Sequence, residues 1–93
     1  MGSDGESDEN LAMRRRRLKL RCWHRGMKET DLLLGRFADS EVEGLDAAGV
    51  AAFEALLETP DQEILGWIVG GEPVPDTARS PILDRLLAFY APR

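Results

Sequence analysis

The sequence predicts an all-α protein, folded as a compact bundle of five short helices. Apolar residues recur at steps of three and four positions along most of the chain, which is the period of an amphipathic helix. Capping residues and glycines divide this pattern into segments, and no stretch alternates long enough to predict a strand. At 93 residues the chain is one domain at most. We expect a disordered acidic tail at residues 1–8 and a single helical domain at residues 9–91.

The first predicted helix runs to about residue 22. Ser7 or Asp8 is a suitable N-cap, and Glu9 then lies in the first turn, where the helix dipole favours negative charge. Much of the surface of this helix is arginine. Its apolar face is formed by Leu11, Leu18 and Cys22.

The second predicted helix spans residues 27–43 and stops at Gly44. Asp46 then caps a third helix at residues 47–58. Both helices carry an apolar stripe at helical spacing, and we expect these stripes to form the core. Their members are Leu33, Leu34, Phe37, Ala38, Val42 and Leu45 in the second stripe and Val50, Phe53, Leu56 and Leu57 in the third.

The stretch Thr59-Pro60-Asp61-Gln62 predicts the start of a fourth helix, which runs to about residue 69. Threonine serves as the N-cap, proline takes the first helical position, and glutamine completes a capping box. Gly70 and Gly71 end this helix. After an extended proline-containing connection, Ser80 caps a last helix that begins with Pro81.

Charge is segregated along the chain, which has a net charge of -5. Residues 14–28 carry cations and no acid, whereas the segments on either side are mainly acidic. The basic run Arg14–Arg21 has three interpretations: a solvated helix face, a contact with nucleic-acid phosphates, or a dock for an acidic protein surface. A small helical nucleic-acid-binding module is therefore the alternative function. The acidic body and the lack of interleaved aromatic residues disfavour it.

Few residues are suited to catalysis or metal binding. Cys22 is the only cysteine and His24 the only histidine, so the chain has no internal disulfide and no cysteine cluster for zinc. The two are two positions apart, which directs them away from each other on a helix. Asp61 and Glu63 are explained by the preference of helix N-termini for acids. We expect no catalytic residue, no metal site and no enzyme activity; an enzyme or flavin-binding protein remains a further alternative.

The sequence contains no segment that predicts membrane insertion. No apolar stretch approaches the roughly 18 residues of a spanning helix. The N-terminal residues are acidic and polar, unlike those of a signal or transit peptide. We therefore expect a cytoplasmic protein.

The most distinctive local pattern is Arg25-Gly26-x-x-Glu29, at the junction between the basic segment and the acidic body. Glycine permits a backbone turn that other residues resist and leaves the backbone uncovered. Arginine supplies a planar fork of donors for carboxylate, phosphate or carbonyl groups. Glutamate lies one turn into the following helix. Residue types and spacing alone fit a simple turn and a docking corner equally well.

The stretch from Arg21 to Leu34, which contains this pattern, resembles the succinate dehydrogenase assembly factors that promote flavinylation, a family marked by an Arg-Gly-x-x-Glu motif. The similarity continues through residues 35–38, 53–58 and 61–67 and the Pro73 loop, and covers about residues 14–90. The resemblance implies a five-helix chaperone that binds the flavoprotein subunit of succinate dehydrogenase, and in some bacteria that of fumarate reductase. It implies that this protein promotes covalent attachment of FAD to a histidine of that subunit.

The resemblance also implies where the partner binds. Arg25, Gly26 and Glu29 match the motif, and we add their neighbours to the predicted partner-binding set, which is Arg21, His24, Arg25, Gly26, Glu29 and Asp31. FAD is attached to the partner, so no cofactor is expected to bind stably to this chain. We expect no nucleic acid as partner and a monomer when the protein is free.

Overall fold

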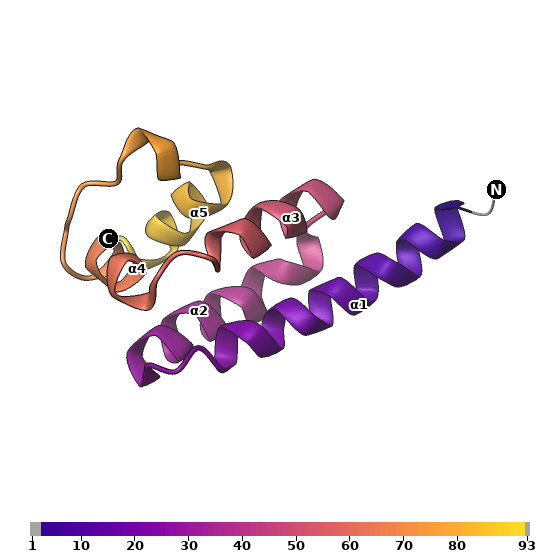
Figure 1. Cartoon of the computed structure of the whole chain (residues 1–93), viewed down its shortest axis with the longest axis horizontal. Helices are drawn as coiled ribbons and strands as arrows, with labels where there is room; N and C mark the ends of the chain where they lie inside the picture. The colour runs from indigo at the N-terminus through magenta and orange to yellow at the C-terminus, as the bar shows by residue number, and fades with distance from the viewer. Residues whose placement is uncertain (1–2, 93) are drawn as a thin grey trace.

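Five α-helices account for most of the described chain, and the longest connection, residues 69–80, joins α4 to α5 (Figure 1). The computed structural model describes the backbone of residues 3–92 and the side chains of residues 10–92. No strand occurs in this part of the chain, which confirms the all-α prediction. The helices are α1 (Ser3–Trp23), α2 (Lys28–Glu41), α3 (Ala47–Leu56), α4 (Asp61–Ile68) and α5 (Pro81–Tyr90), with short 3-10 helices η1 (Val42–Gly44) and η2 (Asp76–Ala78).

The ends of several helices differ from the prediction; α3, for example, ends at Leu56 and not at residue 58. The backbone is helical from Ser3, so α1 begins before the predicted cap and includes most of the segment expected to be a disordered tail. Residues 1 and 2 of that segment lie outside the described residues, and its separation from the domain stays a prediction. The α2 helix ends at Glu41, and the chain tightens into η1 through Gly44. A tightened last turn is a common way for a helix to satisfy its free carbonyl groups.

Two of the four predicted N-caps are confirmed. Asp46 Oδ1 accepts a hydrogen bond from the Gly49 amide at 2.8 Å, and Ser80 Oγ accepts one from the Leu83 amide at 3.2 Å. The predicted capping box at Thr59 is wrong. Pro60 occupies the N-cap of α4 with extended backbone angles and no side-chain cap, so the helix begins at Asp61.

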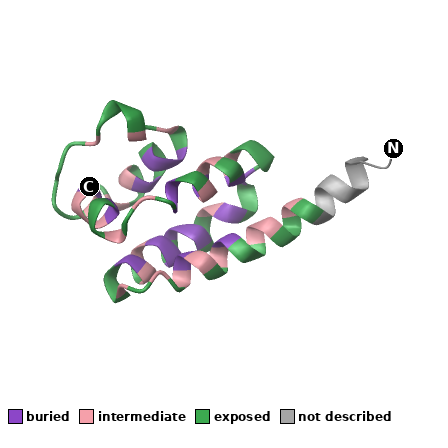
Figure 2. Ribbon diagram, viewed as in Figure 1, coloured by how far each residue is buried: buried purple, intermediate pink, exposed green. Residues whose placement is uncertain are grey.

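Side chains of α2, α3 and α5 meet in the core, with α1 packed along α2 and beside α3 (Figure 1). The Phe37 ring is at its centre, 5.5 Å from the Phe53 ring and 5.4 Å from that of Phe89. Figure 2 shows buried residues on the facing sides of these helices. The largest fully buried side chains include Phe37, Phe53, Leu18, Leu34, Ile64, Leu83 and Leu86.

Helix α1 is the longest element, and its N-terminal part projects beyond the other helices (Figure 1). Its C-terminal half lies against the body through Leu18 and Cys22, which are both buried. The chain then reverses direction at residues 24–27 to enter α2. None of the helices in residues 3–92 is both long enough and apolar enough to cross a membrane.

Candidate functional site

The turn between α1 and α2 depends on a glycine. Gly26 has a φ of +114°, a backbone conformation that residues with a side chain rarely adopt. A Cβ atom built at this position would meet nothing within 4 Å. The predicted turn glycine is therefore confirmed, and the backbone requires it although space does not. Gly26 is exposed, so its peptide groups are accessible at the surface.

Asp31 fixes this turn from within α2. Its Oδ1 atom accepts hydrogen bonds from the backbone amides of Arg25 and Gly26, at 2.5 and 3.3 Å. The N-cap residue of α2, Met27, makes no side-chain cap. The Asp31 carboxylate instead binds amides of the preceding turn, with the negative charge in the first part of the helix, where the dipole favours it. Asp31 thus ties the turn to α2.

The Arg25 side chain points into the protein. Its Nε donates to Asp61 Oδ1 at 2.6 Å, and its two terminal nitrogens donate to the carbonyls of Leu57 and Thr59, at 2.5 and 2.7 Å. Only 11% of the Arg25 side chain and 14% of the Asp61 side chain are exposed. The sequence suggested an outward fork of donors. The structure instead uses that fork to hold the α1–α2 turn against the α3–α4 connection.

The other predicted partner-binding residues surround the turn. Arg21 forms an exposed ion pair with Glu58 at 3.3 Å, and the His24 ring Nδ1 lies 2.9 Å from the Leu20 carbonyl oxygen. Glu29 is exposed in the first turn of α2. The structure therefore brings the whole predicted set to one corner, with Arg25 and Asp31 inside it and His24, Gly26 and Glu29 on its surface.

The basic segment is largely engaged with the rest of the chain. The Arg14 and Lys19 side chains form ion pairs with Glu54 and Glu43, each at 2.9 Å, and Arg15 donates to the Leu45 carbonyl. The pKa of Glu54 is lowered, chiefly by its hydrogen bond from Arg14. Together with Arg21 and Arg25, these residues attach α1 to the acidic body. This arrangement weakens the nucleic-acid interpretation of the Arg14–Arg21 run.

Three of these ion pairs follow a common spacing that the sequence analysis missed. Two cations seven residues apart on α1, and a third four residues later in the α1–α2 turn, meet three acids spaced four and three residues apart. The acids lie on α3, in the α3–α4 connection and at the start of α4. The pairs, which we call the ion-pair ladder, are Arg14–Glu54, Arg21–Glu58 and Arg25–Asp61. Steps of three, four and seven keep residues on one face of a helix. Matching steps of opposite charge were the available sign that the two segments pack side by side.

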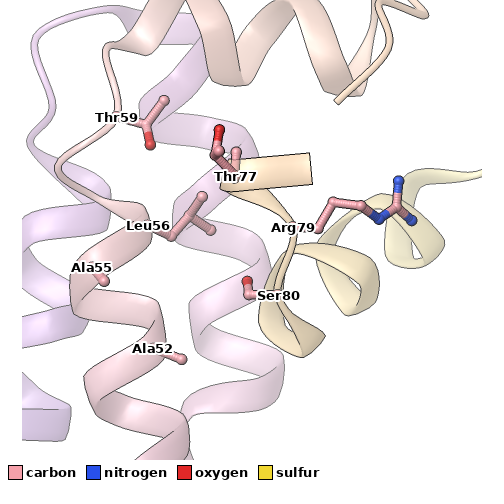
Figure 3. A pocket seen from close by; sticks show the side chains of 8 residues that line it. Ala52, Ala55, Leu56, Thr59, Thr77, Arg79 and Ser80 are labelled. Carbon is pink, nitrogen blue, oxygen red and sulfur yellow. The ribbon is translucent and has the colours of Figure 1, made fainter. Parts of the chain in front are cut away.

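One shallow pocket, about 390 Å³ in volume, lies between α3 and the segment that contains η2 (Figure 3). In Figure 3 the Arg79 side chain extends away from the other labelled residues, and no predicted partner-binding residue lines the pocket. Small and hydroxyl-bearing side chains dominate the lining, which is Ala52, Ala55, Leu56, Thr59, Thr77, Ala78, Arg79 and Ser80. We assign no chemistry to it.

Comparison with known proteins points to one family. A family model described as "Flavinator of succinate dehydrogenase" matches residues 16–90. The chain is 40% identical over 85 residues to the FAD assembly factor SdhE of Acetobacter pasteurianus, covering 91% of this chain and 78% of the relative. It is 44% identical over 75 residues to the protein of the same name from Pseudomonas aeruginosa, covering 74% and 89%. Mitochondrial succinate dehydrogenase assembly factor 2 of Schizosaccharomyces pombe is 34% identical over 74 residues, covering 80% and 53%. No solved structure matches the chain.

Proposed function

Because the chain belongs to the family of flavinators of succinate dehydrogenase, we propose that it is an assembly factor for that enzyme. In this role it binds the flavoprotein subunit and promotes covalent attachment of FAD to it. The observation that carries the proposal is the family match over residues 16–90, together with relatives named as FAD assembly factors. The fumarate reductase flavoprotein is a second partner of the same kind.

In the proposed mechanism the covalent chemistry belongs to the partner's histidine and to the flavin. This chain supplies no catalytic residue. It holds the immature subunit in a reactive geometry, and FAD becomes covalently attached to that partner. The free chain is a cytoplasmic monomer without a stably bound cofactor, and its partner is a protein and not a nucleic acid or a membrane.

The proposed contact is the corner formed by Arg21, His24, Arg25, Gly26, Glu29 and Asp31. Three features support this choice. The Gly26 backbone is uncovered, so a partner chain can approach it closely. Glu29 is exposed beside it. The corner is also built on helix ends held by several hydrogen bonds, so it is rigid enough to present one shape to a partner.

Two substitutions of Gly26 distinguish an effect on partner binding from an effect on folding. Gly26→Ala and Gly26→Arg both carry a side chain at a φ of +114°, and a Cβ fits in the space, so we expect similar losses of stability. Only the arginine covers the turn with a long side chain. We expect helical circular dichroism from both variants, and capture of the apo-flavoprotein subunit by Gly26→Ala but not by Gly26→Arg. Normal capture by Gly26→Arg would remove Gly26 from the contact.

Replacing Glu29 tests the second exposed residue. Glu29→Ala should lower the yield of covalent flavin on the partner, measured by in-gel fluorescence. Asp84→Ala is the matched control, because Asp84 is also an exposed acid in the first turn of a helix, α5. An undiminished flavin signal with Glu29→Ala would count against its role. A wild-type chain that neither captures the subunit nor raises its covalent flavin would refute the proposed function.

A further inference from the structure

Arg25 is anchored to two different parts of the fold. Its backbone amide donates to Asp31 of α2, and its guanidinium donates to Asp61 at the first position of α4. The same guanidinium also binds the carbonyls of Leu57 and Thr59 in the α3–α4 connection. The α1–α2 turn and the α3–α4 connection are therefore joined through one side chain, at the end of the molecule where α4 lies (Figure 1).

We propose that Asp61 is a positioning residue for partner binding, because it holds the Arg25 guanidinium beneath the Gly26 turn and so sets the shape that the partner meets. This inference rests on the proposed function. Asp61 lies outside the Arg-Gly-x-x-Glu pattern, and only 14% of its side chain is exposed. It acts on the partner through Arg25 and Gly26, without touching it.

The hydrogen bonds favour this inward arrangement over an arginine that reaches out to the partner. Turning the guanidinium outward would leave the carboxylate of Asp61 and the carbonyls of Leu57 and Thr59 without these donors. A largely covered carboxylate that loses its charged partner is costly, and so is each carbonyl that loses a bond. Bonds between charged groups at 2.6 Å are also stronger than those between neutral groups. The outward surface of the corner is then the Gly26 backbone and Glu29.

The conformational freedom of Gly26 explains why the turn needs this anchor. A backbone at a φ of +114° is one of several conformations open to glycine, so the residue does not fix the turn by itself. The amide bonds to Asp31 hold one side of the turn. The Arg25–Asp61 pair holds it from below. Without the pair, the turn populates other shapes, and the apparent affinity for the partner falls in proportion to the fraction that remains competent.

The experiment compares Asp61→Ala and Asp61→Asn with Glu54→Ala. Glu54 belongs to the same ion-pair ladder and pairs with Arg14 at 2.9 Å, but it lies away from the turn. Three quantities are measured for each variant: the stability to urea, the amide chemical shift of Gly26 in the isolated chain by NMR, and the affinity for the apo-flavoprotein subunit. Asp61→Glu, which keeps the carboxylate, tests for rescue.

We expect Asp61→Ala to move the Gly26 amide signal and to weaken partner binding about tenfold, as the loss of a charged hydrogen bond of this kind implies. Asp61→Asn keeps an acceptor oxygen and should fall between Asp61→Ala and the wild type, and Asp61→Glu should restore binding in part. Glu54→Ala should lower stability while it leaves the Gly26 signal and the affinity unchanged. A merely structural role for Asp61 would make the two alanine variants behave alike.

The inference is overturned if Asp61→Ala leaves the Gly26 signal in place, or if the signal moves and the affinity does not. Failure of the proposed function has a different signature, namely a wild-type chain that does not bind the subunit. In that case no variant has a measurable affinity for the subunit, and the Gly26 amide signal still decides whether Asp61 positions the turn.

Discussion

Among the glycines that the structure describes, Gly35 has the least room for a side chain, because the Trp23 indole lies against it. This contact predicts the effect of adding one methyl group. A Cβ atom at Gly35 would lie 2.3 Å from both Cδ2 and Cε2 of the Trp23 indole. The indole Nε1 also donates to Asp39 Oδ1 at 3.3 Å, one turn further along α2. Gly35→Ala therefore cannot be accommodated without moving the indole away from α2.

Two opposing terms set the size of the effect. Overpacking a well-packed site costs about 1–3 kcal/mol, and this contact belongs at the upper end because rigid ring carbons receive it. Alanine is favoured over glycine inside a helix by about 1 kcal/mol. We expect Gly35→Ala to lower the free energy of unfolding by about 1–2 kcal/mol. In a domain of this size that corresponds to a decrease of about 4–16 °C in Tm.

Urea denaturation followed by circular dichroism measures this loss. Gly44→Ala is the control, because a Cβ at Gly44 meets nothing within 4 Å and its φ is not left-handed. We expect little change from it. In a Trp23→Leu background the clash is removed, so Gly35→Ala should become neutral or stabilising. Equal stability of Gly35→Ala and the wild type, or an equal loss in the Trp23→Leu background, would refute the steric reasoning.

Three further predictions concern a thiol, an ion pair and a cap. Burial raises the pKa of Cys22 to about 12. Maleimide labelling of this thiol, followed by mass spectrometry, should therefore be slow in the native protein and fast in urea. Fast labelling of the native protein would contradict the buried position. Arg14 lowers the pKa of Glu54 in the folded state. As the pH falls, the Glu54 carboxylate is therefore protonated in the unfolded state before it is protonated in the folded state. The stability that the pair contributes is lost as the pH falls below the ordinary pKa of 4.5. Glu54→Gln should flatten that part of the stability–pH curve, and an unaltered slope would argue against the pair. Ser80→Ala removes the bond to the Leu83 amide and should cost about 1 kcal/mol in urea denaturation, whereas no loss would mean that the cap is dispensable.

Local signals located the helices well because they depend on a few adjacent residues. Asp46 and Ser80 cap helices as predicted, since a cap needs only its own side chain and an amide three residues later. The prediction that Thr59 caps α4 was wrong because of a contact from a distant part of the chain. Its carbonyl accepts a bond from Arg25, and Pro60 stays extended, so α4 begins after the proline. The capping pattern was present, but another part of the chain determined the backbone there.

In the candidate site, too, the local features were predictable from the sequence and the long-range contacts were not. Gly26 was identified because the need for a left-handed φ is a property of a turn and of one residue type. The inward direction of Arg25 was not, because its acceptors are more than 30 residues away along the chain. Only the periodic match between the cations of residues 14–25 and the acids that follow Phe53 carried that information. An isolated arginine beside a glycine does not.

The ion-pair ladder also changes what the segregation of charge means. A chain with a basic helix and an acidic body suggests a cationic surface that awaits a partner. Here the ladder brings the two together, because Arg14, Arg21 and Arg25 face acids of α3, the α3–α4 connection and α4. The corner therefore offers a partner little unpaired charge from these arginines. Its selectivity then rests on the shape of the Gly26 turn and on the exposed Glu29, and the arginine of the motif contributes by keeping that shape.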